Sequence, residues 1–503
     1  MNRTKSTAKN AIMQILSIGI QSILALIVTR TIIVEVGSDY NGITSTATQI
    51  LTFLTLLEGG FTLASLVKLY KPYGENDFTQ VNKLLSLSNK IFKRIGLLYL
   101  LVGIVISVVY APFVKTNATY FDVVIITILS VIPSAFNIYY VCKYRLLFQV
   151  SQSEYLIYGI QIFVNLLMYS SEILILHLYK NIIYARACVA LFQMLNGLII
   201  GMVAKIKFRF ARFNINYDRQ EILGTKDVFV AKISGLVFSS SSVIFISIFI
   251  GTEYTSVYSV YYSVLVLISN IVNAFLLAPR NALGQIFNSN REAMIGKIYN
   301  EYELASTMVS SILYSVTFSL IIPFVRLYVG EIKDVNYVDF PLAVLLVLNG
   351  IAQMVHVPAG TCLEVSGNFK NVKRIQLLSA VIIILLSIVG AKFWGLYGIL
   401  VAKLITSIYL IVAEAFSTRC KILRGTLREA IRVNAPSLLV GVLLAIVEYK
   451  IALPINMGIV DFVFYASLFT IINTILIVFT NYFLCKNELL ALKARIRNLI
   501  TGR

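Results

Sequence analysis

The sequence predicts an all-helical protein that crosses a membrane many times, and three observations lead to this fold class. The chain of 503 residues is 58% hydrophobic and only 13% charged. Its apolar runs are repeatedly long enough for the roughly 20 residues that one helical crossing needs. Basic residues gather in every second connection between these runs, as expected when alternate loops face the cytoplasm.

Reading the apolar runs in order gives about fourteen expected spans. They cover residues 11–34, 43–68, 95–114, 121–142, 155–178, 183–204, 228–250, 257–280, 304–328, 340–363, 375–394, 396–416, 433–450 and 457–485. Glu35 and Asp39 lie between the first two spans, whereas Lys83, Lys90 and Lys93 follow the second. This alternation places both termini in the cytoplasm, and an error of one span would break it.

The expected span 43–68 carries a polar stripe beside one acid, Glu58. Hydroxyl side chains recur there at steps of three and four, namely at Thr44, Thr48, Thr52, Thr55, Thr62 and Ser65. On a helix they would share one face. A carboxylate at the bilayer centre costs about 2.5–3.5 kcal/mol on insertion scales. Two interpretations stay open, a cavity-lining face and a packed seam between helices.

Two further spans carry polar faces. In the first span four polar residues are spaced four, three and four positions apart. The tenth span also carries a polar face, and it contains Pro358, which should bend the helix. The polar faces are Asn10, Gln14, Ser17 and Gln21, and then Asn349, Gln353, His356, Gly360 and Glu364. The residues expected to line a cavity are Gln14, Gln21, Thr55, Gln353 and His356.

Cations outnumber acids within the expected spans. The candidate substrate-binding residues are Arg30, Arg186, Lys232, Arg280 and Lys403. Guanidinium and ammonium groups in a partly dehydrated cavity suit a phosphate or diphosphate group. Two alternatives remain: Lys232 and Arg280 lie near span ends and could snorkel, and the others could form structural ion pairs with acids such as Glu172.

A duplication is indicated by short segments that recur at a similar offset. Phe148-Gln-Val-Ser-Gln-Ser153 resembles Leu363-Glu-Val-Ser-Gly-Asn368, about 215 residues later, and Tyr184 matches Tyr397. Two pseudo-symmetric six-helix bundles with two extra C-terminal helices follow, related by an axis along the membrane normal. The expected divisions are a first bundle over 1–205, a basic linker over 206–227, a second bundle over 228–418, and two helices with an amphipathic tail over 419–503.

Several classes of function find no support in the sequence. Neither a catalytic constellation, a phosphate-binding glycine motif nor metal-ligand spacing stands in a suitable context, so we expect no enzyme, metal or cofactor. The segment 205–213 interleaves basic and aromatic residues, but membrane anchoring explains it better than nucleic-acid binding. In the tail, Leu489 and Leu492 begin an apolar face that predicts an interfacial helix.

Three segments resemble polysaccharide-lipid flippases of the Wzx type, in the superfamily that contains MATE drug exporters and the lipid II flippase. They are Leu57-Glu-Gly-Gly-Phe-Thr-Leu-Ala64, Val257-Tyr-Ser-Val-Tyr-Tyr262, and Glu364-Val-Ser-Gly-Asn-Phe-Lys370 followed by Trp394-Gly-Leu-Tyr-Gly398. The resemblance implies two bundles around a cationic cavity and alternating access. It also loosely matches family cavity arginines to Arg30 and Arg280.

The resemblance implies transport of an undecaprenyl-diphosphate-linked oligosaccharide from the inner to the outer leaflet of the bacterial cytoplasmic membrane, for O-antigen or capsule synthesis. The expected partners are this lipid-linked substrate, membrane lipids, a proton or sodium ion, a polysaccharide polymerase and a chain-length regulator. Glu58 is either the coupling-ion site or only a counter-charge. The alternatives are a drug or organic-cation exporter of the same fold and a membrane-embedded glycan polymerase.

Overall fold

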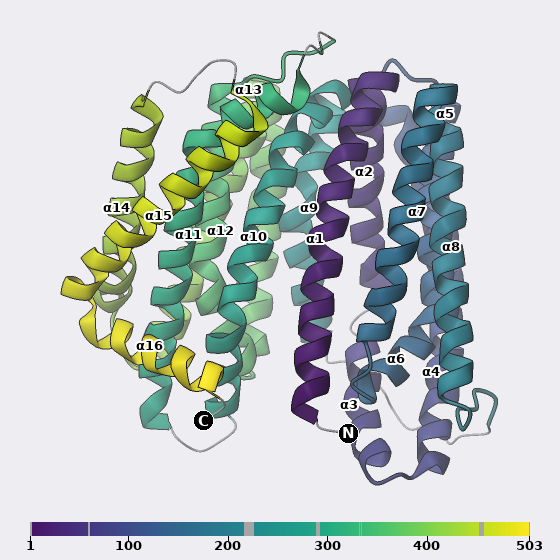
Figure 1. Ribbon diagram of the computed structural model, residues 1–503, viewed down its shortest axis with the longest axis horizontal. Helices are drawn as coiled ribbons and strands as arrows, with labels where there is room; N and C mark the ends of the chain where they lie inside the picture. The colour runs from purple at the N-terminus through teal and green to yellow at the C-terminus, as the bar shows by residue number, and fades with distance from the viewer. Residues whose placement is uncertain are drawn as a thin grey trace. The chain divides into compact units, whose positions relative to one another are not determined.

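The computed structural model describes residues 3–58, 61–215, 226–287, 292–330, 332, 334–451 and 457–501, and these residues include no strand (Figure 1). Eleven helices in this part of the chain are long and apolar enough to cross a membrane. The all-helical membrane fold class is therefore confirmed. The count of fourteen crossings and the two six-helix bundles stay predictions.

Contacts divide the chain into two compact units. Unit 1 is Met1–Leu236 with Ile246–Ser256, and unit 2 is Val237–Phe245 with Val257–Arg503. The helices of unit 1 are α1 (Arg3–Val36), α2 (Ser38–Leu54), η1 (Thr55–Glu58), α3 (Phe61–Gly74), α4 (Phe78–Tyr110), η2 (Ala111–Phe113), α5 (Tyr120–Phe136), η3 (Asn137–Val141), α6 (Cys142–Val150), α7 (Tyr155–Tyr179) and α8 (Ile182–Lys207). Helix α9 (Lys226–Phe249) contributes to both units. The expected division of the chain at 205 and 228 stays a prediction.

The expected span 43–68 is not one continuous helix, so that prediction is wrong. Helix α2 ends at Leu54, a 3₁₀ turn follows over Thr55–Glu58, and α3 begins at Phe61. In the sequence the 3₁₀ turn is followed by Gly59 and Gly60, which lie outside the described residues, and glycine disfavours a helix interior by about 1 kcal/mol relative to alanine. The apolar length of the segment is therefore shared between two shorter helices.

Three of the six hydroxyls in the stripe of this segment bond to their own backbone. Thr48 Oγ1 donates to the carbonyl of Thr44 at 3.1 Å, and Thr52 Oγ1 donates to that of Thr48 at 3.0 Å. Thr55 Oγ1 donates to the carbonyl of Thr52 at 2.6 Å. Such bonds satisfy hydroxyls without a partner helix. These three hydroxyls therefore need no neighbouring polar helix, and Thr48 and Thr55 are exposed, whereas Thr44 Oγ1 and Ser65 Oγ are buried without a hydrogen-bond partner.

The backbone of the basic and aromatic segment after α8 packs on α4, while its basic side chains at Lys205, Lys207, Arg209 and Arg212 are exposed. Asn82 Oδ1 on α4 accepts from the backbone N–H of Arg212 at 2.9 Å, and Ser86 Oγ, one turn later, accepts from that of Ile215 at 3.0 Å. Phe208 is buried. Polar residues of α4 thus supply hydrogen-bond partners for the backbone of an irregular segment, and the role of this segment as a membrane anchor stays a prediction.

Unit 2 contains the C-terminal part of the chain. Its helices are α10 (Thr252–Phe287, from Val257 on), α11 (Glu292–Val329), α12 (Phe340–Val365), α13 (Phe369–Phe416), η4 (Ser417–Ile422), α14 (Leu427–Lys450), α15 (Ile459–Leu484) and α16 (Lys486–Thr501). Helix α13 has 48 residues, which would be about 72 Å if straight, more than twice a hydrocarbon core of about 30 Å.

Helix α13 is a hairpin of two arms rather than one rod. Gly395 has a non-helical backbone, with φ 57° and ψ −131°, in the left-handed half of φ space that favours glycine. Across the bend the backbones of Gly390 and Gly398 touch, and Gln376 Nε2 donates to Glu414 Oε1 at 3.0 Å from arm to arm. The predicted division between the segments 375–394 and 396–416 is therefore confirmed as two helical arms.

The two segments that suggested a duplication fold identically at the backbone. The amide of Ser153 bonds to the carbonyl of Phe148 at 2.8 Å, and the amide of Asn368 bonds to that of Leu363 at 3.2 Å. In each turn the residue before has positive φ, 54° at Gln152 and 74° at Gly367. This is the left-handed helix ending that closes a C-terminus with a six-to-one bond. The sequence repeat thus extends to local structure.

The C-terminal helices are fastened to α11 by a polar seam. Asn473 Nδ2 on α15 donates to Ser315 Oγ at 2.8 Å, and Ser319 Oγ donates to Glu448 Oε2 on α14 at 2.8 Å. Hydrogen bonds between membrane helices contribute about 0.6 kcal/mol each on average, so α14 and α15 are held by several weak bonds in addition to packing.

Helix α16 packs on α11, α14 and α15 within unit 2, and its predicted position at the membrane interface stays a prediction. Arg495 Nε donates to Glu301 Oε2 on α11 at 2.8 Å, and Leu492 is buried. Leu489 joins a hydrophobic cluster with α11, α14 and α15. This part of the apolar face is therefore covered by protein, because the adjoining helices offer it an apolar surface.

Replacing Gly398 by Ala tests the hairpin. An added Cβ would lie 2.0 Å from the backbone oxygen of Gly390, so the arms would have to separate. We expect Gly398→Ala to lower the stability of the purified protein by about 1–3 kcal/mol or more, seen as a lower midpoint of thermal unfolding. In the control Gly296→Ala, the new Cβ meets nothing within 4 Å. Equal midpoints for the two variants would contradict the close approach.

Candidate functional site

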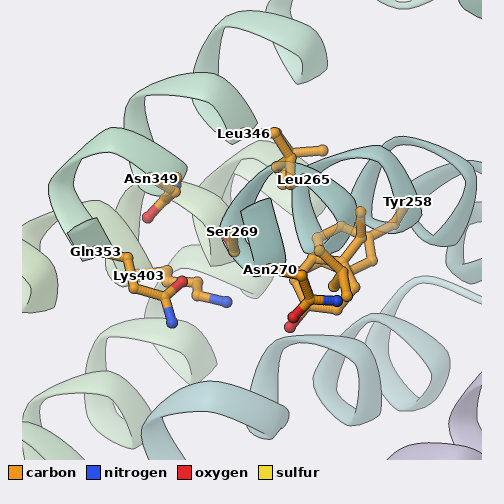
Figure 2. A pocket seen from close by; sticks show the side chains of 11 residues that line it. Tyr258, Leu265, Ser269, Asn270, Leu346, Asn349, Gln353 and Lys403 are labelled. Atoms are coloured by element: carbon orange, nitrogen blue, oxygen red, sulfur yellow. The ribbon is translucent and has the colours of Figure 1, made fainter. Parts of the chain in front are cut away.

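A cavity of about 100 Å³ lies inside unit 2 among α10, α12 and the second arm of α13 (Figure 2). One charged side chain faces the cavity. Four side chains of α10 that bear an amide or a hydroxyl group and two side-chain amides of α12 also face it, together with apolar groups. Its lining residues are Tyr258, Tyr262, Leu265, Val266, Ser269, Asn270, Leu346, Asn349, Gly350, Gln353 and Lys403. We call this cavity the Lys403 pocket.

Helical spacing brings these side chains together. On α10 the lining residues Tyr258, Tyr262 and Ser269 are separated by four and seven positions, which keeps them on one face. On α12, Asn349 and Gln353 are four apart. The sequence thus places one polar stripe on each of these two helices, facing the cavity into which Lys403 projects from α13.

Lys403 is buried without a counter-charge. Only 5% of the residue is exposed, and among the residues described no carboxylate lies within 4 Å of its Nζ. Two aromatic rings lie beside it: the Nζ is 5.5 Å from the ring centroid of Tyr262 and 6.0 Å from that of Phe238. Aromatic faces attract a cation but do not neutralise it, so the pocket carries an uncompensated positive charge.

One buried polar atom of the pocket lining has no partner, and it is a hydrogen-bond acceptor. The Asn349 amide donates to the carbonyls of Leu345 at 2.8 Å and Leu400 at 3.1 Å, which leaves its buried Oδ1 without a partner. Figure 2 shows the polar ends of Gln353, Lys403 and Asn270 turned into the pocket. Side-chain amides can donate hydrogen bonds to an anion beside the ammonium. The ammonium of Lys403 and the amides of Gln353 and Asn270 therefore give the pocket donors for an anion, whereas Asn349 Oδ1 is suited to accept from a hydroxyl group.

Of the predicted substrate-binding residues, the structure places only Lys403 in this pocket, where it meets the predicted cavity-lining residue Gln353. Arg186 instead lies 3.6 Å from the buried carboxylate of Glu172 in unit 1. This contact favours the structural ion pair that the sequence left open. Arg30 and Arg280 are exposed, and the side chain of Lys232 lies outside the described residues.

The other predicted cavity residues lie elsewhere. His356 is half-buried, and its Nδ1 lies 3.0 Å from Glu414 Oε2, so it joins α12 to the second arm of α13. Gln14, Gln21 and Thr55 are exposed on unit 1. The cavity roles of these residues stay predictions.

Glu58, the predicted coupling site, is half-buried at the end of the 3₁₀ turn. It accepts a hydrogen bond from Thr62 Oγ1 across the break between α2 and α3. The acid thus sits where the helix is interrupted, and its role stays a prediction.

The sequence reasoning missed the face of α10. Tyr258, Tyr262 and Asn270 line the pocket, but only the first two fell in a segment singled out there, and for its resemblance alone. The detectable signal was their helical spacing, continued by Ser269.

A family model described as a polysaccharide biosynthesis protein matches residues 4–278, more than half of the chain. The chain belongs to this family. A search of curated proteins finds no match to its sequence. The similarity of this polysaccharide biosynthesis protein to solved structures covers more of the chain than the family model does, and it concerns the fold.

One similar structure is the lipid II flippase MurJ in an inward-closed conformation, with 13% identity, TM-score 0.69, and coverage of 94% of this chain and 98% of that one. Another is an inward-facing multidrug resistance MATE family transporter, with 11% identity, TM-score 0.62, and coverage of 84% and 98%. A third is a MOP superfamily transporter from Pyrococcus furiosus, with 9% identity, TM-score 0.55, and coverage of 85% and 98%. At these identities the likeness shows a transporter-type membrane fold.

Removing the charge of Lys403 tests whether it is uncompensated. We expect Lys403→Met to raise the midpoint of thermal unfolding, because an unpaired ammonium at the bilayer centre costs about 2.5–3.5 kcal/mol. Lys392→Met, an exposed position on the same helix, should leave the midpoint unchanged. A lower midpoint for Lys403→Met would mean that the ammonium has stabilising partners in the free protein.

Proposed function

We propose that this chain is a flippase that moves undecaprenyl-diphosphate-linked oligosaccharide repeat units from the inner to the outer leaflet of the bacterial cytoplasmic membrane, by alternating access, for surface polysaccharide synthesis. Membership of a polysaccharide biosynthesis family and a transporter-type fold support a role in moving a glycan precursor. The observation that carries the proposal is the uncompensated Lys403 in a polar pocket among membrane helices.

The physical problem in this transport is the polar part of the substrate. A diphosphate and its sugars cannot cross hydrocarbon unaided, and a protein cavity with positive charge and hydrogen-bond donors replaces the lost water. The prenyl tail presents the opposite problem, because exposing it to water costs about 0.8 kcal/mol per CH₂. In the proposed mechanism the protein therefore shelters the glycan while the tail stays in lipid, with Arg30 and Arg280 as candidate diphosphate contacts.

A drug or organic-cation exporter of the same fold is the second candidate, because MATE transporters are among the similar structures. The Lys403 pocket argues against it: no acid is among its lining residues, so it would repel a cation. A membrane-embedded glycan polymerase fits the family description but not the transporter-type fold.

The proposal places both termini in the cytoplasm, because the basic connections fall on one side of the expected fourteen spans. A polysaccharide polymerase and a chain-length regulator are its proposed partners, since the flipped repeat unit must be consumed on the outer side. A proton or sodium gradient is the proposed energy source.

Deleting the chain from its source cell tests the function. We expect surface polysaccharide to disappear and complete lipid-linked repeat units to accumulate on the inner leaflet, with both defects reversed when the chain is restored. Accumulation of incomplete units would instead place the defect in assembly of the repeat unit. Normal polysaccharide in a strain without a second flippase would contradict the proposal and favour export of a small molecule.

Glu58→Gln tests the coupling role. Flipping in proteoliposomes should become insensitive to imposed proton and sodium gradients, because the amide keeps the shape of the acid but cannot take up a cation by charge. Glu75→Gln is the control, since Glu75 is exposed beyond the end of α3. If the Glu58 variant responds to both gradients like the wild type, Glu58 is only a counter-charge.

A further inference from the structure

The Lys403 pocket is built for one negative charge. Among the described residues that line it, Lys403 is the only lysine, arginine or acid. A single carboxylate would balance this ammonium. A diphosphate, with about two charges, would leave at least one of them uncompensated in a buried site, which is costly. A lipid-linked oligosaccharide can carry both a carboxylate and a diphosphate. Charge balance favours the carboxylate as the group that binds in this pocket.

The size of the pocket leads to the same distinction. Its volume of about 100 Å³ holds a few water molecules or a small polar group. Pockets that enclose a whole drug-sized ligand have about 300–1,000 Å³. A diphosphate that links a sugar to a prenyl chain is bulky on both sides, whereas a carboxylate projects from the edge of a sugar ring.

The type of donor also favours a carboxylate. Lysine presents a compact point charge, whereas bidentate recognition of phosphate favours the planar fork of arginine. The amides of Gln353 and Asn270 can supply further donors beside the Lys403 ammonium (Figure 2). Tyr258 and Tyr262, whose rings stack at 5.4 Å between centroids, give the pocket an apolar wall against which a sugar ring can lie.

We propose that the Lys403 pocket binds the carboxylate of an acidic sugar in the transported glycan, and that it selects acidic over neutral repeat units. This inference rests on the proposed flippase function. The ammonium of Lys403 takes the carboxylate, the amides of Gln353 and Asn270 donate to its oxygens, and the diphosphate binds outside this pocket. Lys403 is thus a specificity-determining residue rather than a diphosphate ligand.

Transport of two matched substrates tests the selection. They are undecaprenyl-diphosphate-linked oligosaccharides that differ only in one residue, glucuronic acid or glucose. In proteoliposomes we expect Lys403→Gln to slow flipping of the acidic substrate about tenfold or more, because a charge-assisted hydrogen bond is lost, and to change the neutral substrate less than about twofold. Lys392→Gln, the exposed control on the same helix, should change neither rate. An equal loss for both substrates, or no change for either, would overturn the selection.

A binding measurement separates this inference from the proposed function. Saturation-transfer NMR of the purified protein in lipid nanodiscs should detect methyl glucuronoside but not methyl glucoside, and the signal should vanish in Lys403→Gln but persist in Lys392→Gln. Sodium acetate should compete only weakly, since the sugar ring contributes contacts. If pyrophosphate competes more strongly than glucuronate, the pocket is a diphosphate site and the proposal is overturned. If acetate competes as strongly as glucuronate, the pocket binds any small anion and the proposed selection of acidic sugars is overturned. If the wild type flips neither lipid but binds glucuronoside, the flippase function fails while the carboxylate site stands.

Discussion

Inside a bilayer no water is present to satisfy buried polar groups, so the protein must pair them itself, and this constraint organises the described structure. Glu172 meets Arg186, and Glu414 meets His356 and Gln376. The other buried charged side chains in the described ranges also have hydrogen-bonding partners, namely Lys143, Glu301, Glu303, Arg419 and Glu448. Single polar atoms elsewhere also lack a partner, such as Asn473 Oδ1, but among the buried charged side chains in these ranges Lys403 alone has neither an ion pair nor a hydrogen bond. A group that breaks a rule kept by its neighbours is a candidate for binding something that the free protein lacks.

The paired groups explain why Lys403 stays in place. Glu414 fastens the second arm of α13 to α12 through His356 and to the first arm through Gln376, so the helix that carries Lys403 has polar anchors on two neighbours. The contact between Gly390 and Gly398 brings the backbones of the two arms together at the bend. A buried ammonium would otherwise move toward water by reorienting its helix, and these anchors oppose that movement. The seam between α11 and the C-terminal helices stabilises the same unit from another side.

Sequence alone was sufficient for the features that depend on composition and period. The fold class follows from apolar length, and the two arms of α13 follow from the interval between apolar runs around Gly395. Lys403 and Gln353 were chosen because ionisable and amide groups in membrane helices are costly, and the structure brings them to one pocket. The sequence could not show which cations are paired, because Arg186 and Glu172 lie on different helices whose rotation is set by packing. Nor could it predict that irregular backbone near Arg212 would bond to the polar face of α4, since that depends on a contact between residues more than 120 positions apart.

The central claim is that Lys403 binds an anionic part of the glycan. The most direct measurement is a cryo-electron microscopy structure of the protein in lipid nanodiscs with an undecaprenyl-diphosphate-linked oligosaccharide that contains one uronic acid. The account predicts density for the carboxylate about 2.8 Å from the Lys403 ammonium, with the diphosphate outside the pocket. A bound glycan whose carboxylate and diphosphate both lie away from Lys403 would contradict the claim.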